Sequence, residues 1–258
     1  MGTSATLCFI GTGASSGVPM IGCQCGTCQS KNPKNQRLRT SAWIAIGPTN
    51  LLIDASPDMR RQALRYSIPI PDALLITHTH FDHIGGLEEL RAYNVHHKRS
   101  IPCDLSSESF NNIKKLFYYY FEGDGFCASF NFHVLPPPPS EFSIGTTTIS
   151  TVEYTQGPMG VTGYRIGSLA YVTDIKQYDP SLFDRLRNLD VLVLSAVWTT
   201  STKMQLSLEE ALEFQKKVGA KQTYLTHLSH DIDYEAVSAA LPKGVALAYD
   251  GLSVSFSY

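Results

Sequence analysis

The stretch Thr77-His78-Thr79-His80-Phe81-Asp82-His83 places three histidines and one aspartate within a few positions. It follows the apolar run 73–76 and precedes two glycines, so it lies where a predicted strand gives way to a helix. Side chains two residues apart on an extended segment project the same way. His78 and His80 can therefore chelate one ion, while the following turn aims Asp82 and His83 at a second. A lone histidine is usually a partly buried polar ring, but this density favours two adjacent metal ions.

The composition is that of an ordinary globular protein. The chain has 258 residues, of which 43% are apolar and 17% charged, enough for a substantial buried core. A formal net charge of −2 gives no bulk attraction for long nucleic acid or for an anionic membrane, so local cations must hold any anionic ligand. No run approaches the roughly eighteen apolar residues of a membrane span, and residues 1–12 lack a basic stretch followed by an apolar one. We therefore expect a cytoplasmic protein.

Apolar runs and amphipathic stretches alternate along the chain and predict a mixed sheet with helices on its outer faces. No repeat or linker divides the sequence, so residues 1–258 are expected to form a single domain. The predicted strands are 5–10, 41–46, 50–53, 73–77, 147–152, 163–166, 169–173, 191–195, 222–226 and 245–248. The predicted helices are 58–65, 85–93, 107–117, 180–188, 207–218 and 234–241.

Two local signals sharpen this outline. Ser207 begins a capping box and Gly219 provides a C-terminal stop, so the helix between them has the best-defined bounds. The prolines of segment 135–139 exclude a helix or a central strand. This segment is predicted to be an extended crossover between the halves of the fold, with a proline-rich recognition ligand as the alternative.

Several stretches together resemble one known family. Residues 78–83 match the H-x-H-x-D-H pattern of the metallo-β-lactamase superfamily. Residues 52–60, 86–91, 173–174 and 248–251 resemble its PhnP-like branch, phosphodiesterases related to the phosphoribosyl cyclic phosphate enzyme of bacterial phosphonate breakdown. The match extends over nearly the whole chain. It implies an α+β fold, a four-layer αβ/βα sandwich with two sheets face to face, helices outside and the site at one sheet edge.

The resemblance also implies roles for residues far from the motif. Asp174 matches the carboxylate that bridges both metals, and His227 matches the second-site histidine, which completes that site together with Asp82 and His83. Asp54 matches the buried aspartate that holds the ligand turn in place. A carboxylate that merely caps a turn is the alternative for Asp54.

Two positions depart from the family pattern. Gln156 stands where the third histidine of the first site is expected, and an amide is a poor ligand for a transition metal. His78 and His80 are therefore expected to hold the first metal with reduced affinity or with the help of a nearby group. Gln205 stands where relatives tend to carry a histidine near the substrate phosphate, and an amide cannot transfer a proton as a histidine could.

Cys23, Cys25 and Cys28 crowd into one glycine-containing loop, too tightly for ordinary disulfides and suited to a metal. A tetrahedral zinc needs one further ligand, and His230 is the natural fourth. The resemblance pairs this Cys3His set with a structural zinc that pins the loop at 22–28, where the metal's binding free energy becomes folding free energy. A redox-active or merely reduced cysteine group is the alternative. The remaining cysteines are expected to be small buried hydrophobes: Cys8, Cys103 and Cys127.

Positively charged side chains that could contact a substrate phosphate concentrate in segment 32–39, which follows the cysteine loop. Arginine's planar fork makes Arg37, Arg39 and Arg91 the candidate anion contacts, although a charge run is usually a solvated face. His133 is expected to be structural, or to supply the missing imidazole if the proline segment folds over the site. The two histidines at 96–97 are expected to lie at a solvent-exposed helix end.

These features predict metal-dependent hydrolysis of a phosphodiester, with a small nucleotide-like or cyclic phosphate as substrate. One or two ions of zinc or manganese would lower the pKa of water to about 7 and produce hydroxide. Asp82, Asp174 and Gln205 are the candidate catalytic residues, and slow turnover or a good leaving group is expected. The alternatives are a non-catalytic metal- or nucleotide-binding protein with a degenerate first site and, fitting worst, a mononuclear-iron oxygenase. A homodimer is possible, and neither a membrane nor long nucleic acid is expected as a partner.

Overall fold

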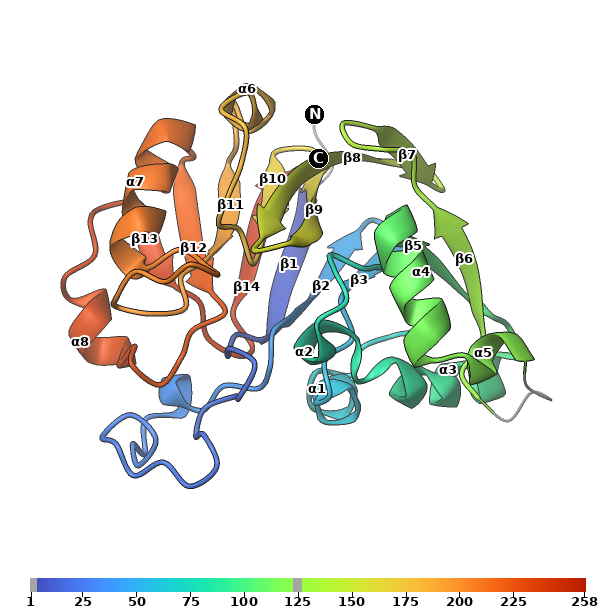
Figure 1. Ribbon diagram of the computed structural model, residues 1–258, viewed down its shortest axis with the longest axis horizontal. Coiled ribbons are helices and arrows are strands. Elements are labelled where there is room, and N and C mark those ends of the chain that lie inside the picture. The colour runs from blue at the N-terminus through green and yellow to red at the C-terminus, as the bar shows by residue number, and fades with distance from the viewer. Residues whose placement is uncertain (1–3, 123–126) are drawn as a thin grey trace.

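The computed structural model describes residues 4–122 and 127–258, so residues 1–3 of the N-terminal segment considered above lie outside it. Within these ranges, two seven-stranded sheets pack face to face with helices on both outer sides (Figure 1). The first sheet contains, in spatial order, β14 (Ser253–Ser257), β1 (Ser4–Gly11), β2 (Ser41–Ile46), β3 (Thr49–Ile53), β4 (Ala73–Leu75), β5 (Ile101–Leu105) and β6 (Phe130–Val134). The second contains β13 (Val245–Leu247), β12 (Gln222–Thr226), β11 (Val191–Ser195), β10 (Leu169–Val172), β9 (Met159–Ile166), β8 (Thr147–Gln156) and β7 (Glu141–Ile144).

Both sheets combine antiparallel and parallel pairing. In the first, β14, β1, β2 and β3 are antiparallel neighbours, and β3 to β6 run parallel. In the second, β7 to β10 are antiparallel neighbours, and β10 to β13 run parallel. Because the carboxyl ends of parallel strands meet at one edge, each sheet offers a row of loops at which a site can form.

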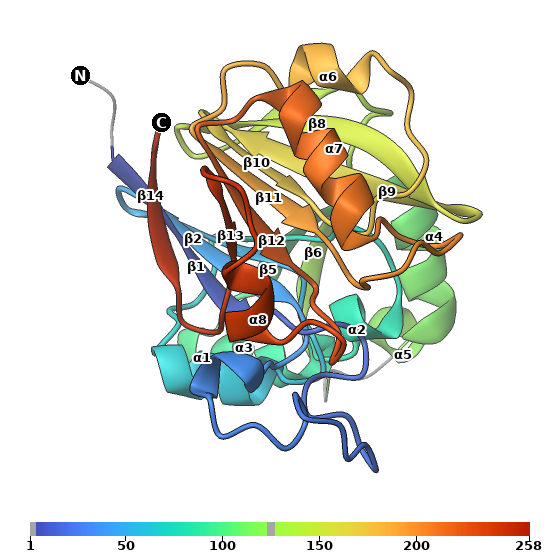
Figure 2. The same cartoon turned by 90° about the vertical axis from the view of Figure 1, so that its left-hand side faces the viewer.

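Three apolar clusters hold the layers together. One lies between the sheets and includes Phe9 and Ile44 from the first and Tyr164 and Tyr171 from the second. The other two lie under the helices, since β-strands buried on both faces need apolar cover on each side. The helices over the first sheet include α1 (Met59–Tyr66), α3 (Arg91–His97), α4 (Ser107–Leu116) and α5 (Tyr119–Glu122), and those over the second include α6 (Leu182–Arg185), α7 (Leu208–Val218) and α8 (Tyr234–Ser238) (Figure 2). The predicted four-layer sandwich is therefore confirmed.

All ten predicted strands are present, with bounds that shift by at most two residues except in β8 and β9, which each extend four residues further than predicted. α7 carries the predicted capping box and its Gly219 end. The helix predicted over 85–93 is wrong. The chain instead forms a 3-10 turn, η2 (Leu87–Leu90), followed by α3. A Cβ on Gly86 would lie 1.9 Å from the Ser56 carbonyl oxygen, so this glycine is required for the close approach of two backbones, not for a helix. The predicted helices over 180–188 and 234–241 are shortened to α6 and α8.

Segment 135–139 links β6 at the edge of the first sheet to β7 at the edge of the second, so the predicted crossover is confirmed. The remaining helical pieces are η1 (Pro33–Asn35) and α2 (Phe81–Ile84). The loop after β1, dark blue in both views, projects from the sandwich (Figures 1 and 2). Among the described residues, no helix has the length and apolarity needed to cross a membrane.

Asp250 ties this projecting loop to the sandwich. Its carboxylate accepts hydrogen bonds from the Thr12 N–H (2.9 Å), the Thr12 hydroxyl (2.8 Å) and the Leu38 N–H (2.8 Å). Burial raises the pKa of Asp250 from 3.8 to about 6. Between these values the folded state binds more protons than the unfolded state, so the stability that this group contributes is lost as pH rises through about 6.

Asp250→Asn removes that titration. We expect the stability of the variant relative to the wild type to rise by roughly 1–2 kcal/mol between pH 4 and pH 7, allowing for partial exposure of the side chain. Urea unfolding at each pH measures the difference, and the exposed Asp184→Asn is the control. A difference that stays constant with pH would contradict the assignment.

Candidate metal centre

The site residues come from the carboxyl ends of parallel strands in both sheets. Asp54 follows β3 and the histidine motif follows β4, while Asp174 follows β10 and His227 follows β12. Asp54, Asp174 and His227 each have a φ of 58°. Non-glycine residues rarely adopt this left-handed conformation, and such strain clusters at functional sites.

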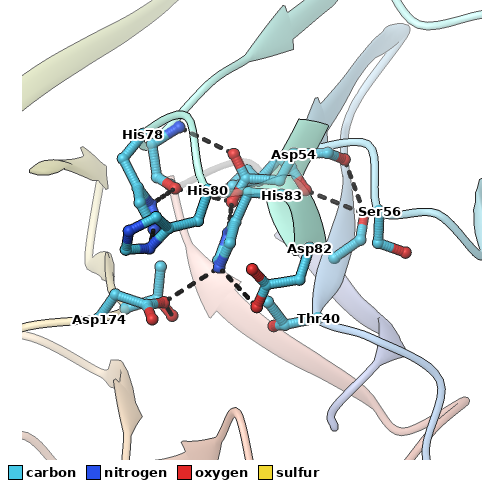
Figure 3. A network of polar contacts seen from close by, with 12 residues as sticks. Thr40, Asp54, Ser56, His78, His80, Asp82, His83 and Asp174 are labelled. Atoms are coloured by element: carbon cyan, nitrogen blue, oxygen red, sulfur yellow. Dashed lines mark hydrogen bonds and ion pairs between the residues drawn. The ribbon is translucent and has the colours of Figure 1, made fainter. Parts of the chain in front are cut away.

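Asp82, His83 and Asp174 lie close together (Figure 3), and His227 joins them. His83 Nε2 lies 3.3 Å from Asp174 Oδ2 and 3.6 Å from Asp82 Oδ2. His227 Nε2 lies 3.2 Å from Asp82 Oδ2 and 3.3 Å from Asp174 Oδ1. The motif in the first half of the chain and the two residues from the second half therefore form one cluster.

The cluster contains two overlapping groups whose ligand atoms lie within 4.8 Å of one another: His78, His83 and Asp174, and Asp82, His83 and His227. His80 lies next to the first group, with its Nδ1 3.0 Å from His78 Nε2. His83 Nε2 is buried without a hydrogen-bond partner. A buried imidazole nitrogen facing carboxylates has the donor chemistry that zinc, iron and manganese accept, so these residues fit a divalent cation.

The electrostatics agree with this fit. Burial and the charge of His83 lower the pKa of His78 well below its usual value. Burial also opposes a charge on His83, but the carboxylates of Asp174 and Asp82 outweigh it and raise its pKa to about 10. Burial opposes ionisation of Asp82 as well, yet His83 and His227 hold its pKa below the usual range. The cluster therefore stabilises positive charge between its carboxylates.

Asp54 holds the ligand turn from beneath. It is fully buried, accepting hydrogen bonds from the Thr77 N–H and hydroxyl (both 2.8 Å), and its Oδ2 lies 2.7 Å from His83 Nδ1. A carboxylate on Nδ1 fixes the imidazole so that Nε2 faces the centre. These contacts show that Asp54 holds the ligand turn and does not merely cap the turn in which it lies.

Both departures from the family pattern lie in the centre. Gln156 donates to Asp174 Oδ1 at 3.3 Å, and Gln205 donates to the same oxygen at close range. Gln156 Oε1 is buried without a partner. The two amides thus contact the carboxylate that is predicted to bridge the metals.

The cysteine cluster also assembles. Cys23 Sγ and Cys25 Sγ lie 3.3 and 3.4 Å from His230 Nδ1, and Cys28 joins them within 4.8 Å. The Cys28 N–H and the His230 ring lower the pKa of the Cys25 thiol to about 6, favouring the thiolate that binds metal. Cys8 and Cys103 are buried, but Cys127 is only half-buried, so the expectation for Cys127 is wrong.

Arg37 is not available to a substrate, contrary to prediction. The residue is 2% exposed, and its guanidinium donates to the Ser229 carbonyl at 2.8 Å and the Ile232 carbonyl at 2.6 Å. Burial lowers its pKa to about 10. Arg37 therefore fixes the chain on both sides of His230.

The other two predicted anion contacts also lie elsewhere. Arg39 forms a bidentate pair with Asp58, at 2.8 and 3.0 Å. Arg91 is exposed at the start of α3. Neither lines the cavity described below. His133 does not supply the missing imidazole, because its Nδ1 lies 3.4 Å from Asp104 Oδ1 on β5. The histidines at 96–97 are exposed at the end of α3, as expected.

An open cavity of about 550 Å³ adjoins the centre. Several residues that line this cavity could not be predicted from the sequence. Ser15, Trp198, Thr202 and Met204 lie in loops that carry no local signal. Thr77 was also missed, although it directly precedes the motif and both its N–H and its hydroxyl donate to Asp54. The cavity is lined by Ser15, His80, Phe81, Asp82, Gln156, Asp174, Val197, Trp198, Thr202, Met204 and Gln205.

Comparisons with known proteins agree with this geometry. Residues 49–228 match the model of the Beta-lactamase superfamily domain. A crystal structure described as a new diphosphatase from the PhnP family is 33% identical, with a TM-score of 0.92 over 100% of both chains. Zn²⁺-bound PqqB from Methylobacterium extorquens is 17% identical, with a TM-score of 0.76 over 96% of this chain and 99% of that one, which shows the fold alone.

Among curated proteins, a Porphyromonas gingivalis protein named octanoyltransferase is 30% identical over 248 residues. The alignment covers 95% of this chain, which spans only 50% of the length of that protein. Coenzyme PQQ synthesis protein B of Cupriavidus taiwanensis is 24% identical, with 97% of this chain and 99% of that protein covered. On the superfamily match and on its full-length similarity to the diphosphatase, the chain belongs to the metallo-β-lactamase superfamily and, within it, to the PhnP family.

Proposed function

We propose that the protein is a metal-dependent hydrolase of a small phosphodiester. The observation that carries this proposal is the convergence of imidazoles and carboxylates from both halves of the chain next to an open cavity. Membership of a superfamily of metallo-hydrolases and the similarity to a diphosphatase of the PhnP family support the reaction class. The substrate would be nucleotide-like or cyclic, and the protein would act in the cytoplasm; a homodimer stays a prediction.

Two metal positions are proposed. His78, His80 and Asp174, with Gln156 nearby, would hold the first ion, and Asp82, His83, Asp174 and His227 the second. Zinc or manganese suits these donors, and a structural zinc is proposed at Cys23, Cys25, Cys28 and His230. When bound, such ions make water nucleophilic at neutral pH and stabilise charge on phosphoryl oxygens.

The chain's own residues position these donors. Asp54 and Thr77 orient His83, and the amides of Gln156 and Gln205 orient Asp174. An amide has no titratable proton, so Gln205 cannot protonate a leaving group. Substrates with good leaving groups should therefore be hydrolysed fastest.

Bis(p-nitrophenyl) phosphate tests the proposal directly. We expect hydrolysis that requires added manganese, zinc or nickel, because the activated ester needs no proton on leaving. Protein purified without added metal should contain two or three ions per chain by elemental analysis, three meaning that both catalytic positions are filled. Absence of hydrolysis with every metal would overturn the hydrolase proposal.

A second candidate is a metal- or nucleotide-binding protein without catalysis. The observation that favours it is the contact of two amides with Asp174. Hydrolysis of bis(p-nitrophenyl) phosphate by the wild-type protein is expected to argue against this second candidate. The variant Gln156→His separates the two functions.

Gln156→His restores an imidazole at the first site. We expect metal affinity there to rise about tenfold or more, because imidazole is the better ligand for these ions, while activity at saturating metal changes less than about threefold. Metal titrations of bis(p-nitrophenyl) phosphate hydrolysis measure both, with the exposed Gln177→His as control. A rise of a hundredfold at saturation would instead mark the natural protein as degenerate.

A further inference from the structure

The cavity at the metal centre has apolar walls. Given the proposed function, on which this inference rests, these walls select among substrates. Three large apolar side chains line it: Phe81 from the first half of the chain, and Trp198 and Met204 from the second. Phe81 is 69% exposed and Met204 is 45% exposed. Exposed large apolar groups around a cavity that contains metal-binding residues indicate a binding surface.

The Phe81 ring is supported on one side. A Cβ on Gly85 would lie 2.8 Å from Phe81 Cζ and 2.8 Å from Pro57 Cγ, so the ring tip lies over the glycine, next to the proline. A residue with a side chain at position 85 would displace the ring. The Phe81 ring therefore rests against the Gly85 backbone on one side and is exposed on the other.

The second wall is held by backbone contacts. The Trp198 carbonyl accepts the Leu208 N–H at 2.8 Å, which attaches it to the start of α7. The neighbouring Val197 carbonyl accepts the Ser229 N–H at 3.1 Å, two residues from His227. The Met204 sulfur and methyl lie against Gly157, next to Gln156, at 3.2 and 3.1 Å from the position of a Cβ there. Trp198 and Met204 thus lie beside residues proposed to bind metal.

The charge of the cavity limits the substrate. No lysine or arginine lines it among the described residues, and its carboxylates are Asp82 and Asp174. Arg37 and Arg39 are paired elsewhere, Arg91 is exposed outside the cavity, and Lys176 contacts Glu210 at 2.8 Å. Two divalent ions against these two carboxylates and the hydroxide that they would hold leave at most one positive charge, and one ion leaves none. Such a site suits a phosphodiester with one negative charge better than a diphosphate or triphosphate.

We propose that the cavity selects a singly charged phosphodiester bearing a flat aromatic group, such as a nucleobase, and that Phe81 and Trp198 are the residues that determine this specificity. An aromatic ring of the substrate would stack on these side chains, an interaction that tolerates any base because each has a π-face. The metal centre would hold the phosphate.

Binding of three non-activated ligands to the metal-loaded protein tests this by calorimetry, without turnover. Diphenyl phosphate carries one charge and two rings, dimethyl phosphate carries one charge and no ring, and P1,P2-diphenyl diphosphate carries two charges and the same rings. We expect diphenyl phosphate to bind at least about tenfold more tightly than dimethyl phosphate, and more tightly than the diphosphate.

Phe81→Ala and Trp198→Ala should each weaken diphenyl phosphate binding by about fivefold or more and leave dimethyl phosphate binding and metal content unchanged. Phe81→Tyr should restore the binding, and Tyr118→Ala, an exposed aromatic residue outside the cavity, should have no effect. Equal effects of the alanine variants on the binding of diphenyl phosphate and of dimethyl phosphate, or tighter binding of the diphosphate, would overturn the inference. Absence of metal-dependent hydrolysis would overturn the proposed function instead, and the binding series would still report on the cavity.

Discussion

Asp174→Ala should lose about a thousandfold or more of the metal-dependent hydrolysis of bis(p-nitrophenyl) phosphate. Asp174 is 1% exposed, and its two oxygens contact His83 and His227, one from each half of the chain. Removing this carboxylate takes a shared ligand from both proposed metal positions. Metal ions supply several kcal/mol of transition-state stabilisation, and each 1.36 kcal/mol is a factor of ten in rate. The measurements are kcat/KM and metal ions per chain.

Asp174→Asn keeps the shape of the side chain and should show a similar loss if the alanine variant unfolds. The exposed Asp179→Ala, on the same connection after β10, is the matched control and should keep wild-type activity. Undiminished activity in both Asp174 variants, with their folding verified by circular dichroism, would defeat the hydrolase mechanism built on this centre.

Cys25→Ser should lower the melting temperature by roughly 10 °C and remove one zinc ion per chain. The loop has little apolar content to hold it, and Ile21 beside it is 99% exposed. A metal present at about a thousand times its dissociation constant stabilises by about 4 kcal/mol, and in a chain of this size each kcal/mol is worth about 2–4 °C. Calorimetry and elemental analysis measure the two effects.

Cys127→Ser provides the control, since Cys127 is half-buried but lies outside the cluster. Its zinc content and melting temperature should match those of the wild type. A Cys25→Ser protein that retains every zinc ion and melts with the wild type would show that the cysteines serve another purpose, such as redox chemistry.

Much of the fold could be predicted because its central strands are short apolar runs that periodicity detects. The strands that were missed, β5, β6, β7 and β14, are not continuous apolar runs, and β6, β7 and β14 alternate apolar and polar residues over only four or five positions. β5 contains Pro102 and Asp104, and β14 alternates buried and exposed residues at the end of the first sheet. Whether such segments pair is decided by distant partners, because β14 pairs with β1 from the opposite end of the chain. Local pattern cannot report that contact.

The site shows the same division. The histidine motif and the cysteine loop are dense local clusters, and the resemblance supplied the distant Asp174 and His227. Arg37 was assigned wrongly because its partners, Ser229 and Ile232, lie about 190 positions along the chain, as the separations of 192 and 195 show. An arginine next to a predicted metal loop looks available until the carbonyls that surround it are known.

The proline crossover at 135–139 has a consequence for how this protein can be divided. Each half of the chain carries an incomplete set of ligands, with His78 to His83 before the crossover and Asp174 and His227 after it. Fragments separated at this point should each be inert, and mixing them should restore activity only when β14 of the second fragment re-pairs with β1 of the first. The crossover is therefore the natural cut site for a split reporter whose signal measures reassembly.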